Sequence, residues 1–190
     1  MQIPLALPML NREVQNHMYK SISFYWSTIL ASTVSFLFYP VIVSIVSFWF
    51  FGLDDSSFVS FLVWTAALTL TATCGFTFGL MLGAIVEEQN SAIQTNLLFG
   101  MIFSFGGGMY ANTGSGANPL IRALSFISPI RPASELLLRA ILKEKQGGSV
   151  VLAYFGFTWG ERVCFLALAG FTAVALVAGW LVIAFKYRNV

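Results

Sequence analysis

The amino-acid sequence predicts an all-α integral membrane protein with four transmembrane helices. First, 57% of its 190 residues are hydrophobic and only 9% are charged, and the mean hydropathy is +0.80. Soluble domains carry roughly 25% charged residues, so much of this surface must face lipid. Second, four long uncharged runs cover most of the chain. Third, backbone groups inside a bilayer must pair within their own segment, which favours helices over open strands.

Each of the four uncharged runs is long enough to cross the hydrocarbon core, which takes roughly 20 helical residues. We expect the spanning helices at 21–52, 57–86, 91–110 and 163–185. The first two exceed the length needed, so tilting or kinking is expected there. Pro40 lies inside the first run, where it removes a backbone donor and should kink the helix.

The connections between the runs differ in length. Short polar turns, Gly52–Asp55 and Glu87–Ser91, join the first three runs. The third connection, 111–160, is much longer and begins with a glycine-rich stretch. Its charged residues accompany an apolar helical face, which predicts an amphipathic helix that lies at the membrane surface or dips into it. That face comprises Leu136, Leu137, Ala140 and Ile141, beside Glu135, Arg139 and Lys143.

Small residues recur at helical spacing in the second run. Gly75, Gly79 and Gly83 lie four residues apart, a spacing that lets another backbone approach closely. A second stripe of threonines lies on a different face and comprises Thr65, Thr69, Thr73 and Thr77. We interpret the glycines as helix-packing positions, with a polar path for a ligand as the alternative.

The residues before the first run predict an amphipathic helix over 10–20 that leads directly into the first span. Leu10, Val14 and Met18 share one face, and polar residues, Arg12 and Glu13 among them, occupy the rest. Such a helix is either an interfacial anchor or a docking surface for a soluble partner.

Motifs for catalysis and ion coupling are missing from the sequence. None of the four runs has an ionisable residue near its middle, which argues against an ion-coupled pump, a voltage sensor or an intramembrane protease. The zinc-protease, serine-hydrolase and Walker A patterns do not occur, so we expect no catalytic residue, no metal site and no cofactor bound by this chain. The formal net charge of +2 gives no reason to expect nucleic-acid binding. Cys74 and Cys164 lie in apolar runs, and no disulfide is expected.

Five short patterns, in order along the chain, resemble the membrane domain of G-subfamily ABC transporters, which has the type-2 exporter fold. The family's coupling helix, R/H-E-x5-Y, is matched by Arg12, Glu13 and Tyr19. A proline followed twelve residues later by Gly-Leu is matched by Pro40 and Gly52. The remaining matches are an F-S-x-G ending at 103–106, the loop motif S-P-hydrophobic-basic-x3-E-x-L at 128–137, and a final span with the basic tail 186–190. The chain departs from the family at Pro132, where an aromatic residue is usual, and at 106–108, where glycines replace bulky apolar residues.

The resemblance implies a transporter part, namely the third to sixth spans, with the family's nucleotide-binding domain and first two spans expected upstream. ATP and Mg would be bound by that domain, and a second membrane domain, identical or different, would complete a substrate cavity in the bilayer. Coupling to the ATPase would involve Arg12, Glu13, Gln15 and Tyr19. The substrate pathway would be lined by Leu98, Met101, Ile102 and Phe105, although simple core packing explains that face equally well.

Function and topology follow from the same resemblance. Family members export lipids, sterols or amphipathic compounds, and this chain would act in a plasma or organelle membrane; the alternative is a non-transporting four-span assembly or scaffold protein. The start and the tail would lie in the cytoplasm. Asp54–Asp55 and the long connection would lie outside, and Glu87–Glu88 inside. The distribution of Lys and Arg does not favour this orientation by itself.

Overall fold

The computed structural model of this chain is all-helical wherever it describes the residues. It describes 9, 12–13, 16, 18–19, 21–52, 58–86, 88–108, 118–142 and 148–186, except for the side chains at 21, 34 and 35. The helices bounded there are α2 (Ser21–Phe50), α3 (Phe58–Ile85), α4 (Gln89–Gly106), α5 (Pro119–Ile127), α6 (Ile130–Leu142), α7 (Gly148–Phe155) and α8 (Glu161–Lys186). Within those ranges there is no strand.

Three of the described helices, α2, α3 and α8, are long and apolar enough to cross a membrane. Their exposed surfaces are rich in large apolar side chains, such as Leu30, Trp49 and Leu166, which suits contact with lipid. The predicted span at 91–110 corresponds to α4. It is not confirmed as a fourth span, because amide and hydroxyl side chains in 89–96 make its first half too polar.

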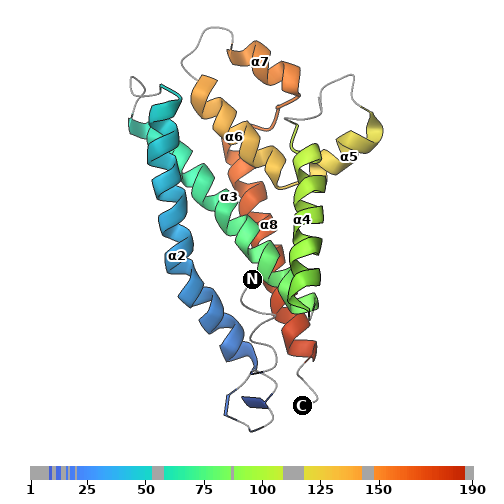
Figure 1. Cartoon of the computed structure of the whole chain (residues 1–190). Coiled ribbons are helices and arrows are strands. Elements are labelled where there is room, and N and C mark those ends of the chain that lie inside the picture. Colours follow the sequence, from blue (N-terminus) through green and yellow to red (C-terminus); the bar gives the residue numbers. More distant parts are fainter. Residues whose placement is uncertain are drawn as a thin grey trace.

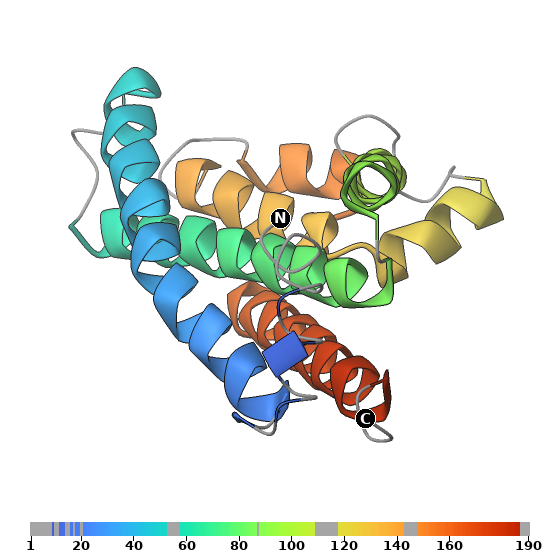
Figure 2. The same ribbon diagram turned by 60° about the horizontal axis from the view of Figure 1, so that its bottom comes forward.

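α3 lies at the centre of the bundle and contacts α2, α4, α6 and α8 (Figure 1). In both views α3 lies between α2 and α4 (Figures 1 and 2). Helices α5, α6 and α7 gather at the upper end in Figure 1, where α2 and α4 end and where α3 and α8 begin. The opposite, lower end holds the starts of α2 and α4 and the ends of α3 and α8.

Aromatic side chains join α4 to α3 and α8. The ring of Phe78 on α3 lies 5.6 Å from Phe99 and 5.2 Å from Phe103, both on α4, measured between ring centroids. Phe171 on α8 lies 6.0 Å from Phe78 and 6.1 Å from Phe103. Pairs at these separations prefer the tilted and edge-on arrangements seen here, which contribute beyond the apolar area that they bury.

A buried tyrosine joins α2 to α8 near the lower end of the bundle. Tyr25 is fully buried, and its hydroxyl donates a hydrogen bond of 3.1 Å to the carbonyl of Leu176. The ring lies against Gly179, where a Cβ atom would come within 2.6 Å of the tyrosine oxygen. Glycine at 179 therefore makes room for Tyr25. Farther along α2, the hydroxyls of Ser44 and Thr65 lie 2.6 Å apart and join α2 to α3.

The predicted element boundaries differ from the structure mainly in the long connection. One amphipathic helix was expected in 111–160, whereas the described part holds three, α5, α6 and α7. The Asn118 side chain accepts a hydrogen bond from the backbone N–H of Leu120, and Pro119 follows it, which are typical start signals for a helix. The first span was expected to reach residue 52, but α2 ends at Phe50, before Gly52 adopts a φ of 60°.

Candidate functional site

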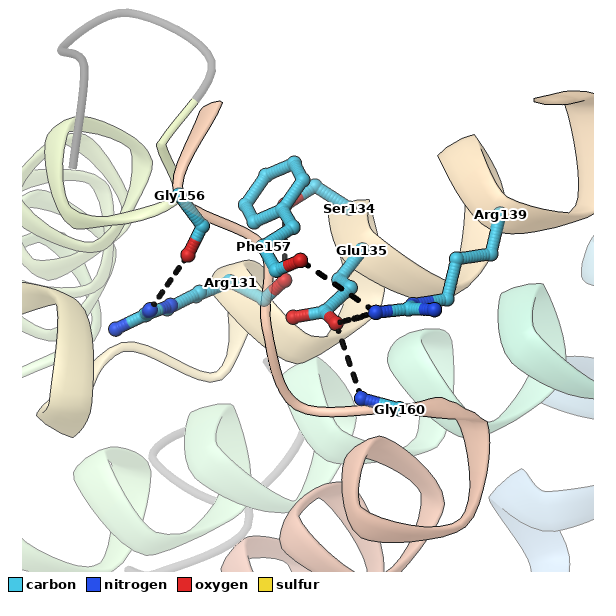
Figure 3. Close-up of polar contacts among 7 residues, drawn as sticks. All are labelled: Arg131, Ser134, Glu135, Arg139, Gly156, Phe157 and Gly160. Atoms are coloured by element: carbon cyan, nitrogen blue, oxygen red, sulfur yellow. Dashed lines mark hydrogen bonds and ion pairs between the residues drawn. The ribbon is translucent and has the colours of Figure 1, made fainter. Parts of the chain in front are cut away.

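A cluster of polar side chains, three of them buried, lies along α6 (Figure 3). We call Arg131, Ser134, Glu135 and Arg139 the α6 cluster. Arg131 is 4% exposed, Ser134 is 5% exposed and Glu135 is fully buried. Their spacing of three or four residues places them on neighbouring parts of one helical face. Residues of the loop motif singled out in the sequence therefore form part of the buried interior.

Glu135 joins α6 to the beginning of α8. Its Oε1 atom accepts hydrogen bonds from Arg139 Nε at 3.0 Å and Nη2 at 2.8 Å, and from the backbone N–H of Gly160 at 3.2 Å (Figure 3). Gly160 has a φ of 70° and immediately precedes α8, whose first backbone bond runs from Cys164 to the Gly160 carbonyl. A carboxylate at a helix N-terminus satisfies a free N–H group and is favoured by the helix dipole.

Arg131 joins α6 to α5 and to the segment between α7 and α8. Its guanidinium donates hydrogen bonds to Ser125 Oγ at 2.8 Å and to the Gly156 carbonyl at 3.1 Å. It also lies between the rings of Phe126 and Trp159, about 5 Å from each centroid (5.1 and 5.0 Å), a cation–π arrangement. Burial lowers the pKa of the Arg131 guanidinium, and the negative charge of Glu135 opposes that shift.

Two serines, Ser128 and Ser134, form hydrogen bonds with the end of α4. Ser128 Oγ donates to the Phe103 carbonyl at 2.6 Å, and Ser134 Oγ donates to the Gly107 carbonyl at 2.8 Å. The approach is close, since a Cβ atom at Gly106 would lie 2.9 Å from the Leu124 carbonyl oxygen. Gly106 and Gly107 therefore leave room for α5 and α6, since a Cβ atom at Gly107 would lie 2.6 Å from Ile130 Cγ2.

Two atoms of the α6 cluster, Arg131 Nε and Glu135 Oε2, have no hydrogen-bond partner among the described residues. The other polar contacts of the cluster join α4, α5, α6 and α8 at one end of the bundle. Within the described ranges, no group of three or more His, Cys, Asp and Glu side chains is placed to hold a metal ion. The cluster therefore holds these helices together. The sequence pointed to the loop motif at 128–137 but did not predict its hydrogen-bond partners.

The predicted substrate-pathway residues lie on α4, on the side away from the aromatic contacts. Leu98, Met101 and Phe105 are 57%, 66% and 61% exposed, whereas Ile102 is half-buried. The structure therefore places the first three on one open face and turns Ile102 towards its edge.

The predicted coupling residues are partly described. Gln15 and much of the expected helix 10–20 lie outside the described residues. Tyr19 donates a hydrogen bond to the carboxylate of Glu13, which raises the pKa of Tyr19 to about 12. The Tyr19 ring stacks on Phe24 and packs, with it, against the buried cluster of Tyr25, Leu80, Ala84 and Ile183. Arg12 is exposed.

The predicted glycine stripe on α3 meets no close neighbour in the described part of the chain at two of its positions. A Cβ atom at Gly75 or Gly79 would have nothing within 4 Å, whereas Gly83 is buried. Close packing at Gly75 and Gly79 therefore stays a prediction, which now concerns contacts outside this chain.

Sequence reasoning missed Gly179, because a single glycine in an apolar helix carries no repeating pattern.

Long helices with apolar outer surfaces, joined by polar segments at both ends, define a multi-pass integral membrane protein. Residues 2–142 match the family described as ABC-2 type transporter. The chain belongs to this family and forms a membrane part of an ABC-type transporter. Membrane domains of this family normally pair with a nucleotide-binding domain and a membrane partner. A comparison with individual curated proteins gave no match.

Proposed function

We propose that this chain is the third-to-sixth-span part of a G-subfamily exporter that moves lipids, sterols or amphipathic compounds. A nucleotide-binding domain would bind ATP and Mg and supply the energy. The observation that carries this proposal is the connection of Glu13 through Tyr19 to the buried cluster shared by α2, α3 and α8. A contact made at Glu13 would thereby act on three membrane helices at once.

In this proposal α4 is the remaining span. Its 18 residues extend about 27 Å, close to the roughly 30 Å thickness of the hydrocarbon core. It runs antiparallel to α3 from the lower to the upper end of the bundle (Figure 1). The polar first half of α4 then faces the second membrane domain or a cavity, since amides exposed to lipid would lack partners.

The upper end of Figure 1 would face outside, and α6 would dip into the outer part of the membrane. In support of this, Leu136 packs with Leu168, two turns into α8. Leu137 packs near Trp64 and Leu68, which lie two to three turns into α3. α6 therefore lies beside the spans and not beyond their ends. This depth suits a re-entrant helix whose charges are paired within the protein.

Substituting Glu13 tests the coupling role. Arg12, Glu13 and Gln15 would contact the nucleotide-binding domain, where a charge-assisted hydrogen bond contributes about 1.5–3 kcal/mol. Glu13→Gln in the complete transporter should reduce substrate-stimulated ATP hydrolysis and transport together, by about tenfold or more. The matched control is Glu88→Gln, an exposed carboxylate just before α4, which begins at the same end of the bundle as α2; this variant should leave both activities unchanged.

The measurement compares both activities in proteoliposomes, with folding checked by gel filtration. Tyr19→Phe should give an intermediate loss, since it removes only the bond that positions Glu13. If Glu13→Gln behaves as the Glu88 control does, the N-terminal segment is an interfacial anchor and the coupling role is wrong.

A second substitution tests the pathway. Met101→Trp on the open face of α4 should change substrate preference without affecting assembly. Leu166→Trp offers a matched control, because Leu166 is 72% exposed on α8 and its surroundings would be lipid. Equal transport of every substrate by both variants would remove this face from the pathway.

A further inference from the structure

The open face of α4 changes its chemistry along the helix. Asn90 and Gln94 are exposed near its start, and the exposed residues that follow on the same side are apolar. We call this face the α4 stripe: Asn90, Gln94, Leu97, Leu98, Met101 and Phe105. Ala92 is buried, and Phe99 and Phe103 on the opposite side contact Phe78 of α3, with Phe103 also contacting Phe171 of α8. The side chains of the stripe are thus exposed along the length of the described helix.

Charge is missing from the α4 stripe. Between Gln89 and Gly106 the sequence contains no acidic or basic residue. The neighbouring carboxylate, Glu88, precedes the helix and accepts a hydrogen bond of 2.8 Å from Ser91 Oγ. A charged ligand group would therefore lose its hydration without gaining a counter-ion on this face.

The two amides determine what the stripe can hold. Each primary amide offers two N–H donors and one carbonyl acceptor, which suits hydroxyl, sugar or amide groups. Facing hydrocarbon, the same amides would have no partner and would be costly to bury. The distance along the helix from Gln94 to Phe105 is about 16 Å, enough to contact an extended apolar body.

We propose that the α4 stripe selects amphipathic substrates with an uncharged, hydrogen-bonding headgroup. Asn90 and Gln94 bind the headgroup near the inner end, and Leu98, Met101 and Phe105 contact the apolar body. This proposal rests on the proposed export function and names the substrate class of that same pathway. Asn90 and Gln94 become specificity-determining residues, which the sequence analysis did not single out.

The test uses the complete transporter in lipid nanodiscs. ATP hydrolysis is measured against an alkyl glucoside, an alkyl sulfate and an alkyl trimethylammonium of equal chain length. The glucoside should stimulate at the lowest concentration. Gln94→Leu should raise its half-maximal concentration by about two- to tenfold, the effect of one lost hydrogen bond. The near-isosteric Gln94→Glu should shift the preference towards the trimethylammonium compound.

Asn96→Leu is the matched control. It makes a similar change two residues farther along, about 200° around the helix, and should leave the headgroup preference as it was. The proposal is overturned if the alkyl sulfate stimulates ATP hydrolysis at the lowest concentration, or if both Gln94 variants keep the wild-type preference. It is also overturned if Gln94→Leu dissociates the membrane domains, because the stripe would then be a protein interface. In each of these cases stimulation by an amphiphile still supports export. If no amphiphile stimulates ATP hydrolysis or is transported, the export function itself fails, and this proposal with it.

Discussion

Removing the Glu135 side chain should destabilise the end of the bundle where α6 packs against α8. The carboxylate is fully buried and accepts three hydrogen bonds, two from Arg139 and one from the N–H of Gly160. In Glu135→Ala the Gly160 N–H loses its acceptor, and the buried guanidinium of Arg131 loses its nearby negative charge. The contact between α6 and the start of α8 therefore loses the hydrogen bond to Gly160, and α6 keeps a buried positive charge without its counter-charge.

The size of the effect follows from the burial of the groups left behind. Deleting one partner of a buried ion pair costs about 3–5 kcal/mol. Arg139 is 25% exposed and can turn towards water, so we expect the lower end, about 3 kcal/mol. In a protein of this size, each kcal/mol shifts the unfolding temperature by about 2–4 °C, which gives a decrease of about 6–12 °C.

The assay is thermal unfolding of the purified chain in lipid nanodiscs, followed by intrinsic tryptophan fluorescence. Glu135→Gln keeps an acceptor for Gly160 and should fall between the wild type and Glu135→Ala. Glu88→Ala, at an exposed carboxylate, should change the stability by less than about 1 kcal/mol. If Glu135→Ala unfolds at the same temperature as Glu88→Ala, the α6 cluster does not stabilise the upper end of the bundle in Figure 1.

Three further outcomes are expected. Gly179→Ala should cost about 1–3 kcal/mol through overlap with the Tyr25 hydroxyl, measured by thermal unfolding, and Tyr25→Phe should partly restore the stability of that variant. Tyr19 should ionise at about pH 12 in a spectrophotometric titration, and Glu13→Gln should lower that value. Because the folded pKa lies above the ordinary value of 10.0, the bond's contribution to stability is complete below pH 10 and disappears as the pH rises through 12. Ser149→Cys, in a background without the native cysteines, should react with an impermeant thiol reagent in intact cells, and reaction only after permeabilisation would reverse the proposed orientation.

Much of the architecture could be predicted because lipid imposes strong rules on composition. Uncharged runs long enough to span a bilayer leave few alternatives to helices, and α2, α3 and α8 lie where those runs predicted them. α4 was harder to assign, because its first half carries amides that lower its apolarity. The length of this run and its lack of charge predicted a span there. The mean hydropathy of α4 is too low to count it with α2, α3 and α8 as a helix able to cross a membrane.

The candidate site was less predictable, since its contacts join residues far apart in the chain. The loop motif pointed to Arg131 and Glu135, but only the fold shows that they bond to Ser125, Gly156 and Gly160. These partners are a serine and two glycines in ordinary surroundings, with no pattern that marks them.

The order of the residues in the α6 cluster has a consequence for how the protein is made. Glu135 is synthesised before Gly160 and before the whole of α8. Until α8 has entered the bilayer, the carboxylate lacks the N–H group that it caps, and an incompletely paired charge is costly to place at membrane depth. In the re-entrant placement proposed for α6, this helix would therefore stay in water until α8 has inserted. Because α6 contacts both α3 and α8, it would reach its final position only when the last helix is in place, and packing of this end of the bundle would then be a late step of biogenesis.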